Sequence, residues 1–227
     1  MKVLILGDGL LGMEIHKQTG WDQVSRKLGN LPRLEDWGKI CTLIKNHDVI
    51  INCIAHTDSY SDDKNIHYNI NYKFVSNLSR ACDNEKVKLV HISTEFIYAN
   101  NEKPPNEEDL PQPDNTWYAY TKLLADEYIK SHNNNYLICR ELHKPNPFPY
   151  PEVWDVKTSG DTVDKISMLI VELIKRKATG VYNVGTGDKN LKDLAPKAEL
   201  VLPPPHIPKD TRMNLNKLNK FLNDKNL

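Results

Sequence analysis

Tyr118 and Lys122 are four positions apart and form the pattern YxxxK. On a helix, residues at this spacing share a face, so the lysine ammonium would stand beside the phenol. A phenol has an ordinary pKa of about 10, and a nearby cation lowers that value. The tyrosine could then donate a proton to a carbonyl oxygen while a hydride adds to the carbonyl carbon. A surface Tyr and Lys with no such role is the alternative interpretation.

The hydroxyl pair Ser93-Thr94 follows an apolar run at residues 87–92, which predicts a buried strand. In open parallel sheets, ligands bind beyond the carboxyl ends of the strands. We therefore expect Thr94 to hydrogen-bond the same substrate oxygen as Tyr118. A threonine that merely ends the strand is the alternative.

A glycine motif of the form GxGxxG lies between an apolar run at residues 3–6 and a predicted helix at residues 10–19. A motif in this position is typical of dinucleotide binding, because the helix N-terminus offers free N–H groups and partial positive charge to a pyrophosphate. A glycine turn without a ligand is the alternative. The predicted cofactor-binding residues of this loop are Gly7, Gly9, Leu10, Leu11 and Gly12.

The residues that select the ribose should follow a second strand, predicted at residues 21–24. An NAD site usually offers an acid there. This chain offers Ser25, Arg26 and Lys27, whose cations could pair with a 2′-phosphate. We therefore predict NADP(H) as the preferred cofactor, with NAD(H) as the second choice. A solvated basic turn is the alternative.

Predicted strands and helices alternate along the chain, which favours an α/β fold with a Rossmann-type, doubly wound parallel sheet. The further strands are expected at residues 49–54, 136–139 and 181–184, and the further helices at residues 36–46, 71–82, 118–131 and 164–176. Residues 141–158 contain four prolines and are predicted to form a loop. We expect a dinucleotide-binding domain at residues 1–140. Residues 141–227 should form a reduced substrate-binding lobe, interleaved with the last strands and helices of the same domain.

Charge and cysteine content exclude several classes of protein. The 227 residues include 30 Lys and Arg and 30 Asp and Glu, so no nucleic-acid or membrane partner is expected. The four cysteines show no CxxC spacing, which suits reduced thiols in a cytoplasmic protein and predicts no metal site.

The order GxGxxG, INCIAHTD, HISTEFIY and YxxxK resembles the extended short-chain dehydrogenases/reductases, and among them the dTDP-4-dehydrorhamnose reductases. This resemblance implies a catalytic set of Thr94, Tyr118 and Lys122, with Lys122 also holding the nicotinamide ribose. It implies that Asn71 supports proton transfer. It also implies further cofactor contacts by Ala55, His56 and Thr57.

The predicted substrate contacts are Thr94, Glu95, His143 and Arg212. Glu95 takes the place of an Asp in those reductases, and His143 stands where their Arg-Thr-Ser-Trp pattern has Trp. Arg212 has a planar cationic fork that suits a diphosphate. It is expected to border the cleft together with residues 158–161 and the proline-rich loop.

The resemblance implies an NADPH-dependent reductase that acts on a 4-keto-6-deoxy sugar nucleotide. A homodimer is the expected assembly. A sugar-nucleotide epimerase or a bifunctional epimerase/reductase stays open, with Cys139 and His143 as candidate acid–base residues. Dehydration is disfavoured, because Thr94-Glu95-Phe96 lacks the second acid that dehydratases carry. A non-catalytic regulatory subunit is the alternative of another class, since the methionine adenosyltransferase β subunit resembles the same reductases.

Overall fold

The computed structural model describes residues 1–32, 36–99 and 101–224. Its centre is a sheet of six parallel strands in the order β10-β5-β4-β3-β1-β2. These strands are β1 (Val3–Leu6), β2 (Asp22–Val24), β3 (Val49–Asn52), β4 (Lys88–Thr94), β5 (Tyr136–Glu141) and β10 (Gly180–Val184). The predicted α/β class with a doubly wound parallel sheet is confirmed.

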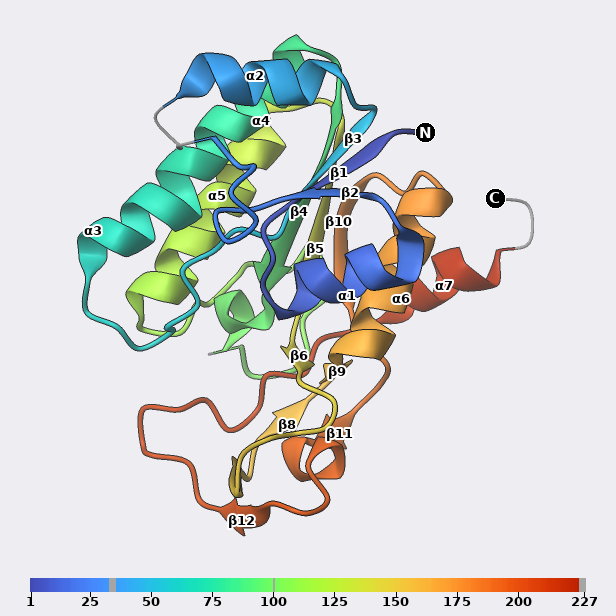
Figure 1. Ribbon diagram of the computed structural model, residues 1–227. Helices are drawn as coiled ribbons and strands as arrows, with labels where there is room; N and C mark the ends of the chain where they lie inside the picture. The colour runs from blue at the N-terminus through green and yellow to red at the C-terminus, as the bar shows by residue number, and fades with distance from the viewer. Residues whose placement is uncertain (33–35, 100, 225–227) are drawn as a thin grey trace.

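Helices cover both faces of this sheet, as Figure 1 shows. One layer holds α1 (Leu10–Thr19), α6 (Val163–Lys175) and α7 (Asn216–Asn223), and the other holds α2 (Trp37–Lys45), α4 (Phe74–Asn84) and α5 (Trp117–His132). Successive side chains of a strand point to opposite faces. Val3 and Ile5 of β1 therefore pack in the first layer, and Leu4 and Leu6 pack in the second. Burial on both faces explains why the strands read as continuous apolar runs.

The helix predicted from residue 71 begins earlier in the structure. A continuous helical segment runs through α3 (Lys64–His67), the π-helical turn η1 (Tyr68–Lys73) and α4. The side chain of Asp63 caps its start by accepting a hydrogen bond from the N–H of Ile66 at 3.1 Å. The apolar spacing used for the prediction starts only at Phe74, because the buried residues before it, His67 and Asn71, are polar.

The prediction of a loop over residues 141–158 is wrong in part, because the segment contains three short strands. They are β6 (His143–Lys144), β7 (Glu152–Trp154) and β8 (Lys157–Thr158), which pair with β9 (Asp161–Thr162), β12 (Glu199–Val201) and β11 (Lys189–Asn190) respectively. The four prolines lie between β6 and β7, outside the paired residues. The partners of β7 and β8 lie far along the chain, so local sequence could not reveal the pairing.

These short strands belong to a small lobe that lies beyond the carboxyl ends of the central strands (Figure 1). Val153, Val156, Leu191 and Ile207 form its core, apart from the two layers of the sheet. The predicted boundary at residue 140 stays a prediction. Among the helices that the described residues form, none has the length and apolar character needed to cross a membrane.

Candidate active site

A cavity of about 630 Å³ opens at the carboxyl ends of the central strands. Residues at or just beyond the ends of β1, β3, β4 and β5 line it, including Gly7, Ile54, Thr94 and Glu141. β1 and β3 are neighbours in the sheet, although β2 lies between them in the sequence. The winding of the chain reverses there, and such a switch point is where open α/β sheets bind ligands.

The glycine loop forms one wall of the cavity, and its geometry requires glycine at two positions. Gly7 has a φ of 103°, in the left-handed region. A Cβ on Gly12 would lie 2.5 Å from the carbonyl oxygen of Gly7, so the helix could not approach the strand end with any side chain there. Gly9 is the N-cap residue of α1 and has no side chain to cap the helix, which leaves the first N–H groups of α1 for a ligand. Gly7, Gly9, Leu10, Leu11 and Gly12 all line the cavity.

The residues predicted to select the ribose are only partly brought to this cavity. Ser25 and Arg26 line it, whereas Lys27 is exposed and is not among the lining residues. The hydroxyl of Ser25 is buried and accepts a hydrogen bond from the N–H of Leu28 at 3.0 Å, which closes the turn after β2. Arg26 is therefore the cation of this turn that can meet a phosphate in the cavity.

The segment after β3 is held in place by Asn71, which is fully buried in the π-helical turn η1. The Asn71 side chain accepts a hydrogen bond from the N–H of His56 at 2.8 Å and donates one to its carbonyl at 3.1 Å. Ala55 and Thr57 line the cavity, while His56 and Asn71 do not. π-Helical turns are often found at functional sites, and this one fixes the backbone that borders the cavity. Asn71 is therefore a positioning residue here.

Thr94, Tyr118 and Lys122 meet in the cavity. Thr94 ends β4, while the other two lie on α5, whose N-terminus is capped by Thr116 through a 3.2 Å hydrogen bond from the N–H of Ala119. The side chains of Thr94 and Tyr118 are hydrogen-bonded to each other. Tyr120, by contrast, is 48% exposed and does not line the cavity.

The electrostatics of this group differ from the sequence-based expectation that Lys122 lowers the pKa of Tyr118. Burial raises the pKa of Tyr118 to about 12, and Lys122 is not among the main groups that shift it. The Lys122 ammonium is directed elsewhere. It donates to the carbonyl of Ile92 at 2.5 Å and lies 3.2 Å from Nε2 of His91. Burial also lowers the pKa of Lys122 to about 8.

Of the residues predicted to contact the substrate, the structure brings Thr94 and His143 to the cavity but not Glu95 or Arg212. Glu95 is buried, and its carboxylate accepts hydrogen bonds from Thr211 at 2.6 Å and Thr158 at 3.1 Å. Burial raises the pKa of Glu95 to about 8. This carboxyl group therefore ties the end of β4 to the lobe.

Arg212 lies away from the cavity lining and forms ion pairs with two acids. Its guanidinium is 2.6 Å from Asp210 and 3.1 Å from Asp188. The proline-rich segment does reach the cavity, through Pro145 and Tyr150. The expectation that this segment borders the cleft therefore agrees with the geometry, whereas the same expectation for Arg212 does not.

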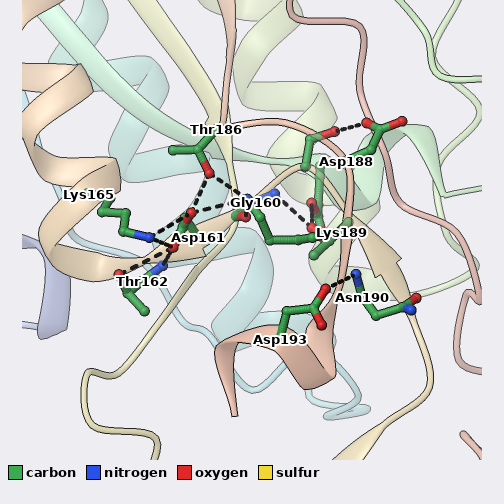
Figure 2. A network of polar contacts seen from close by, with 12 residues as sticks. Gly160, Asp161, Thr162, Lys165, Thr186, Asp188, Lys189, Asn190 and Asp193 are labelled. Atoms are coloured by element: carbon green, nitrogen blue, oxygen red, sulfur yellow. Dashed lines mark hydrogen bonds and ion pairs between the residues drawn. The ribbon is translucent and has the colours of Figure 1, made fainter. Parts of the chain in front are cut away.

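Residues 158–161 do not line the cavity. Figure 2 shows Asp161 in a polar network with Thr186 and Lys189. The buried Asp161 carboxylate binds Lys189 at 3.1 Å, Lys165 at 3.1 Å and the hydroxyl of Thr186. These hydrogen bonds outweigh burial and lower the pKa of Asp161 well below its usual range. Thr162, the next residue, is the N-cap residue of α6.

The lining residues that were not predicted individually include Cys53, Glu141 and Lys144. A signal for Glu141 exists in the sequence, since it follows the apolar run of β5 at the strand end where ligands bind. Glu141 lies in register with Thr94 on the adjacent β4. Among the described residues, no group of three or more His, Cys, Asp or Glu side chains is placed to hold a metal ion.

The model of one protein family, described as the RmlD substrate binding domain, matches residues 1–142. The dTDP-4-dehydrorhamnose reductase of Mycobacterium tuberculosis is 30% identical over 96 residues, which make up 38% of this chain and 31% of that protein. The chain thus spans about a third of the length of this curated relative.

Methionine adenosyltransferase 2 subunit beta of Pongo abelii matches this chain over a longer stretch. The two are 26% identical over 181 residues, which cover 73% of this chain and 52% of that protein. Among solved structures, the dTDP-4-dehydrorhamnose reductase of Bacillus anthracis in complex with NADP has a TM-score of 0.81 at 21% identity, covering 97% of this chain and 93% of that chain. This structural likeness extends the shared fold over nearly the whole chain.

Proposed function

The chain belongs to the family of the RmlD substrate binding domain, and from this premise we propose that it is an NADPH-dependent reductase of a 4-keto-6-deoxy sugar nucleotide. The observation that carries the proposal is the meeting of Thr94, Tyr118 and Lys122 with the glycine loop in one cavity. Such a cavity can hold a dinucleotide against one wall and a carbonyl oxygen against the hydroxyl pair. The M. tuberculosis relative, a dTDP-4-dehydrorhamnose reductase by name, supports the choice of substrate class.

The glycine loop fits the cofactor. The close approach of Gly12 to Gly7 and the uncapped first turn of α1 make a cradle for a pyrophosphate. Arg26 lines the same cavity, and its guanidinium is suited to a 2′-phosphate. These features support NADP(H) over NAD(H).

Tyr118 is the proton donor in this proposal. A bound nicotinamide would supply the hydride. Because the pKa of Tyr118 is about 12, the phenol carries its proton at neutral pH and can give it to the carbonyl oxygen. Thr94, which hydrogen-bonds the phenol, holds that oxygen and Tyr118 in line. Lys122, with a pKa of about 8, is largely cationic at pH 7, and its role in this proposal is to hold the nicotinamide ribose.

The proposal is tested by following NADPH consumption with a panel of 4-keto sugar nucleotides, including dTDP-4-dehydrorhamnose. We expect turnover with at least one member and a product two mass units heavier than the ketone. Absence of NADPH consumption across the panel, by protein that binds NADPH, would refute the reductase.

A non-catalytic regulatory role is the second candidate. The length of the match to methionine adenosyltransferase 2 subunit beta favours it, since that match covers 73% of this chain. A regulatory subunit would bind NADPH without consuming it and would alter the activity of a partner enzyme. The same assay therefore separates the two candidates.

A further inference from the structure

A carboxylate and an imidazole stand side by side at the end of β5. Glu141 is the last residue of β5 and lies in register with Thr94 on β4. His143 follows two positions later, and residues two apart on extended chain project to the same side. Both Glu141 and His143 line the cavity that Thr94 and Tyr118 line.

The contact between the two side chains fixes the protonation of the ring. Nδ1 of His143 lies 3.0 Å and 3.1 Å from the two carboxylate oxygens of Glu141. A carboxylate can only accept, so Nδ1 carries the hydrogen and Nε2 of the neutral ring is an acceptor. In the part of the chain that the structure describes, Nε2 has no hydrogen-bond partner. The His143 side chain is 25% exposed, whereas that of Glu141 is 4% exposed.

We infer that His143, positioned by Glu141, is a general base that removes a proton from the carbon next to the keto group of the bound sugar. The protein would then catalyse enolisation at that carbon as a second activity of the same cavity. This inference rests on the proposed function, because both reactions use the same keto sugar nucleotide. The geometry that carries it is the contact of His143 with Glu141 at the wall of the cavity that Thr94 and Tyr118 also line.

The step balances without a cofactor. Nε2 of His143 takes the proton, the electron pair of the C–H bond forms the C=C bond of the enol, and the carbonyl electron pair moves to oxygen. Tyr118 gives its proton to that oxygen. In the reverse step the Tyr118 phenolate takes the proton back from the enol oxygen, the imidazolium gives its proton to carbon, and the ketone is restored. In deuterium oxide the imidazolium exchanges with solvent, so the carbon acquires deuterium.

His143 is better placed for this role than Cys139, the other residue that the sequence suggested. Cys139 is fully buried in the apolar layer beside α6, and burial raises the pKa of its thiol far above the neutral range. Burial lowers the pKa of His143; of the charged groups that face it, Glu141 raises this pKa and Lys144 lowers it. The net effect is a raised pKa for His143, which strengthens it as a base.

The test is deuterium exchange into dTDP-4-keto-6-deoxyglucose in deuterium oxide without NADPH, using the full chain. The wild type should label the carbon beside the carbonyl faster than the protein-free solution does. His143→Gln should slow the enzymatic exchange by about 10²–10⁴-fold, the usual contribution of a general base. His132→Gln is the matched control, because His132 is exposed on α5 and outside the cavity. It should exchange as the wild type does.

Glu141→Gln tests the positioning residue and keeps the imidazole. It should slow exchange and shift the pH profile of exchange to lower pH, because the anion that raises the pKa of His143 is gone. A merely structural role of Glu141 would not move that profile. If His143→Gln loses NADPH binding and so is misfolded, the pH shift of Glu141→Gln decides the question.

The outcomes separate this inference from the reductase proposal, since NADPH-dependent reduction is measured in parallel. Reduction with exchange no faster than in protein-free solution overturns the inference alone, as does a folded His143→Gln that exchanges like the wild type. Exchange that depends on His143 without any reduction supports the inference and refutes the reductase. Neither exchange nor reduction refutes both.

Discussion

Removing one oxygen atom from Tyr118 should abolish most of the turnover and leave the protein folded and able to bind its cofactor. The Tyr118→Phe change keeps the ring, which packs at the start of α5 against Phe96 with ring centroids 6.0 Å apart. The hydrogen bond to Thr94 is lost, but the Thr94 hydroxyl keeps its 3.3 Å contact with the N–H of Phe96. The cost in folding free energy is therefore that of one ordinary hydrogen bond, about 0.5–1.5 kcal/mol.

The cost in catalysis is larger. General acid catalysis contributes about 10²–10⁴-fold, which corresponds to about 2.7–5.4 kcal/mol of transition-state stabilisation at about 1.36 kcal/mol per tenfold. The loss should appear in kcat, with the dissociation constant of NADPH changed less than about threefold, because the change removes no charge and no cofactor-facing backbone.

The assay compares Tyr118→Phe with Tyr120→Phe, a matched change two positions along the same helix. Tyr120 is 48% exposed and contacts Trp117 with ring centroids 5.8 Å apart, outside the cavity lining. It should keep its turnover. If Tyr120→Phe were inactive and Tyr118→Phe active, the assignment of the proton donor would be refuted.

Five further changes test the loop, the cofactor preference and the lobe. Gly12→Ala should destabilise the fold by about 1–3 kcal/mol in urea unfolding, since its Cβ would meet backbone at 2.5 Å, whereas Gly9→Ala, with open space around its Cβ, should not. Comparable urea midpoints for both variants would contradict this. In cofactor titrations, Arg26→Ala should remove about 1–3 kcal/mol of the binding preference for NADPH over NADH. Lys27→Ala, outside the cavity, should change that preference less. Equal affinity of the wild type for both cofactors would refute the preference. Asp161→Asn should lower stability at neutral pH by about 1–3 kcal/mol. Because the folded pKa of Asp161 is depressed, its contribution is present above the unfolded value of about 3.9 and is lost as pH falls below it, so wild type and variant should converge in acid; a constant difference from pH 7 to pH 3 would argue against the network.

Local patterns in the sequence were sufficient to predict the sheet and the glycine loop. The apolar run of β1, the glycines after it and the periodicity of α1 each depend on residues close together in the chain. These elements can therefore be predicted from short stretches of sequence. The same holds for Tyr118 and Lys122, which share one helix.

Contacts between distant residues could not be predicted. The position of Glu95 in the sequence suggests a substrate-binding acid. Its carboxyl group instead accepts hydrogen bonds from Thr158 and Thr211, which are 63 and 116 positions away along the chain. Arg212 looked free for a diphosphate, but Asp188 and Asp210 bind its guanidinium. In both cases a partner brought by the fold of the lobe forms hydrogen bonds with the side chain. Burial likewise decided the pKa of Tyr118, which helix spacing alone had suggested would be lowered.

Isotope transfer from the cofactor to the sugar tests the central claim most directly. NADPH with deuterium at the transferable position of the nicotinamide is incubated with a 4-keto sugar nucleotide and the protein, and the product is analysed by mass spectrometry and NMR. We predict one deuterium on the former carbonyl carbon with the wild type, and a rate about 10²–10⁴-fold lower with Tyr118→Phe. Recovery of unreduced sugar with undiminished labelled NADPH, or deuterium at any other carbon, would contradict the assignment of this cavity as a reductase site.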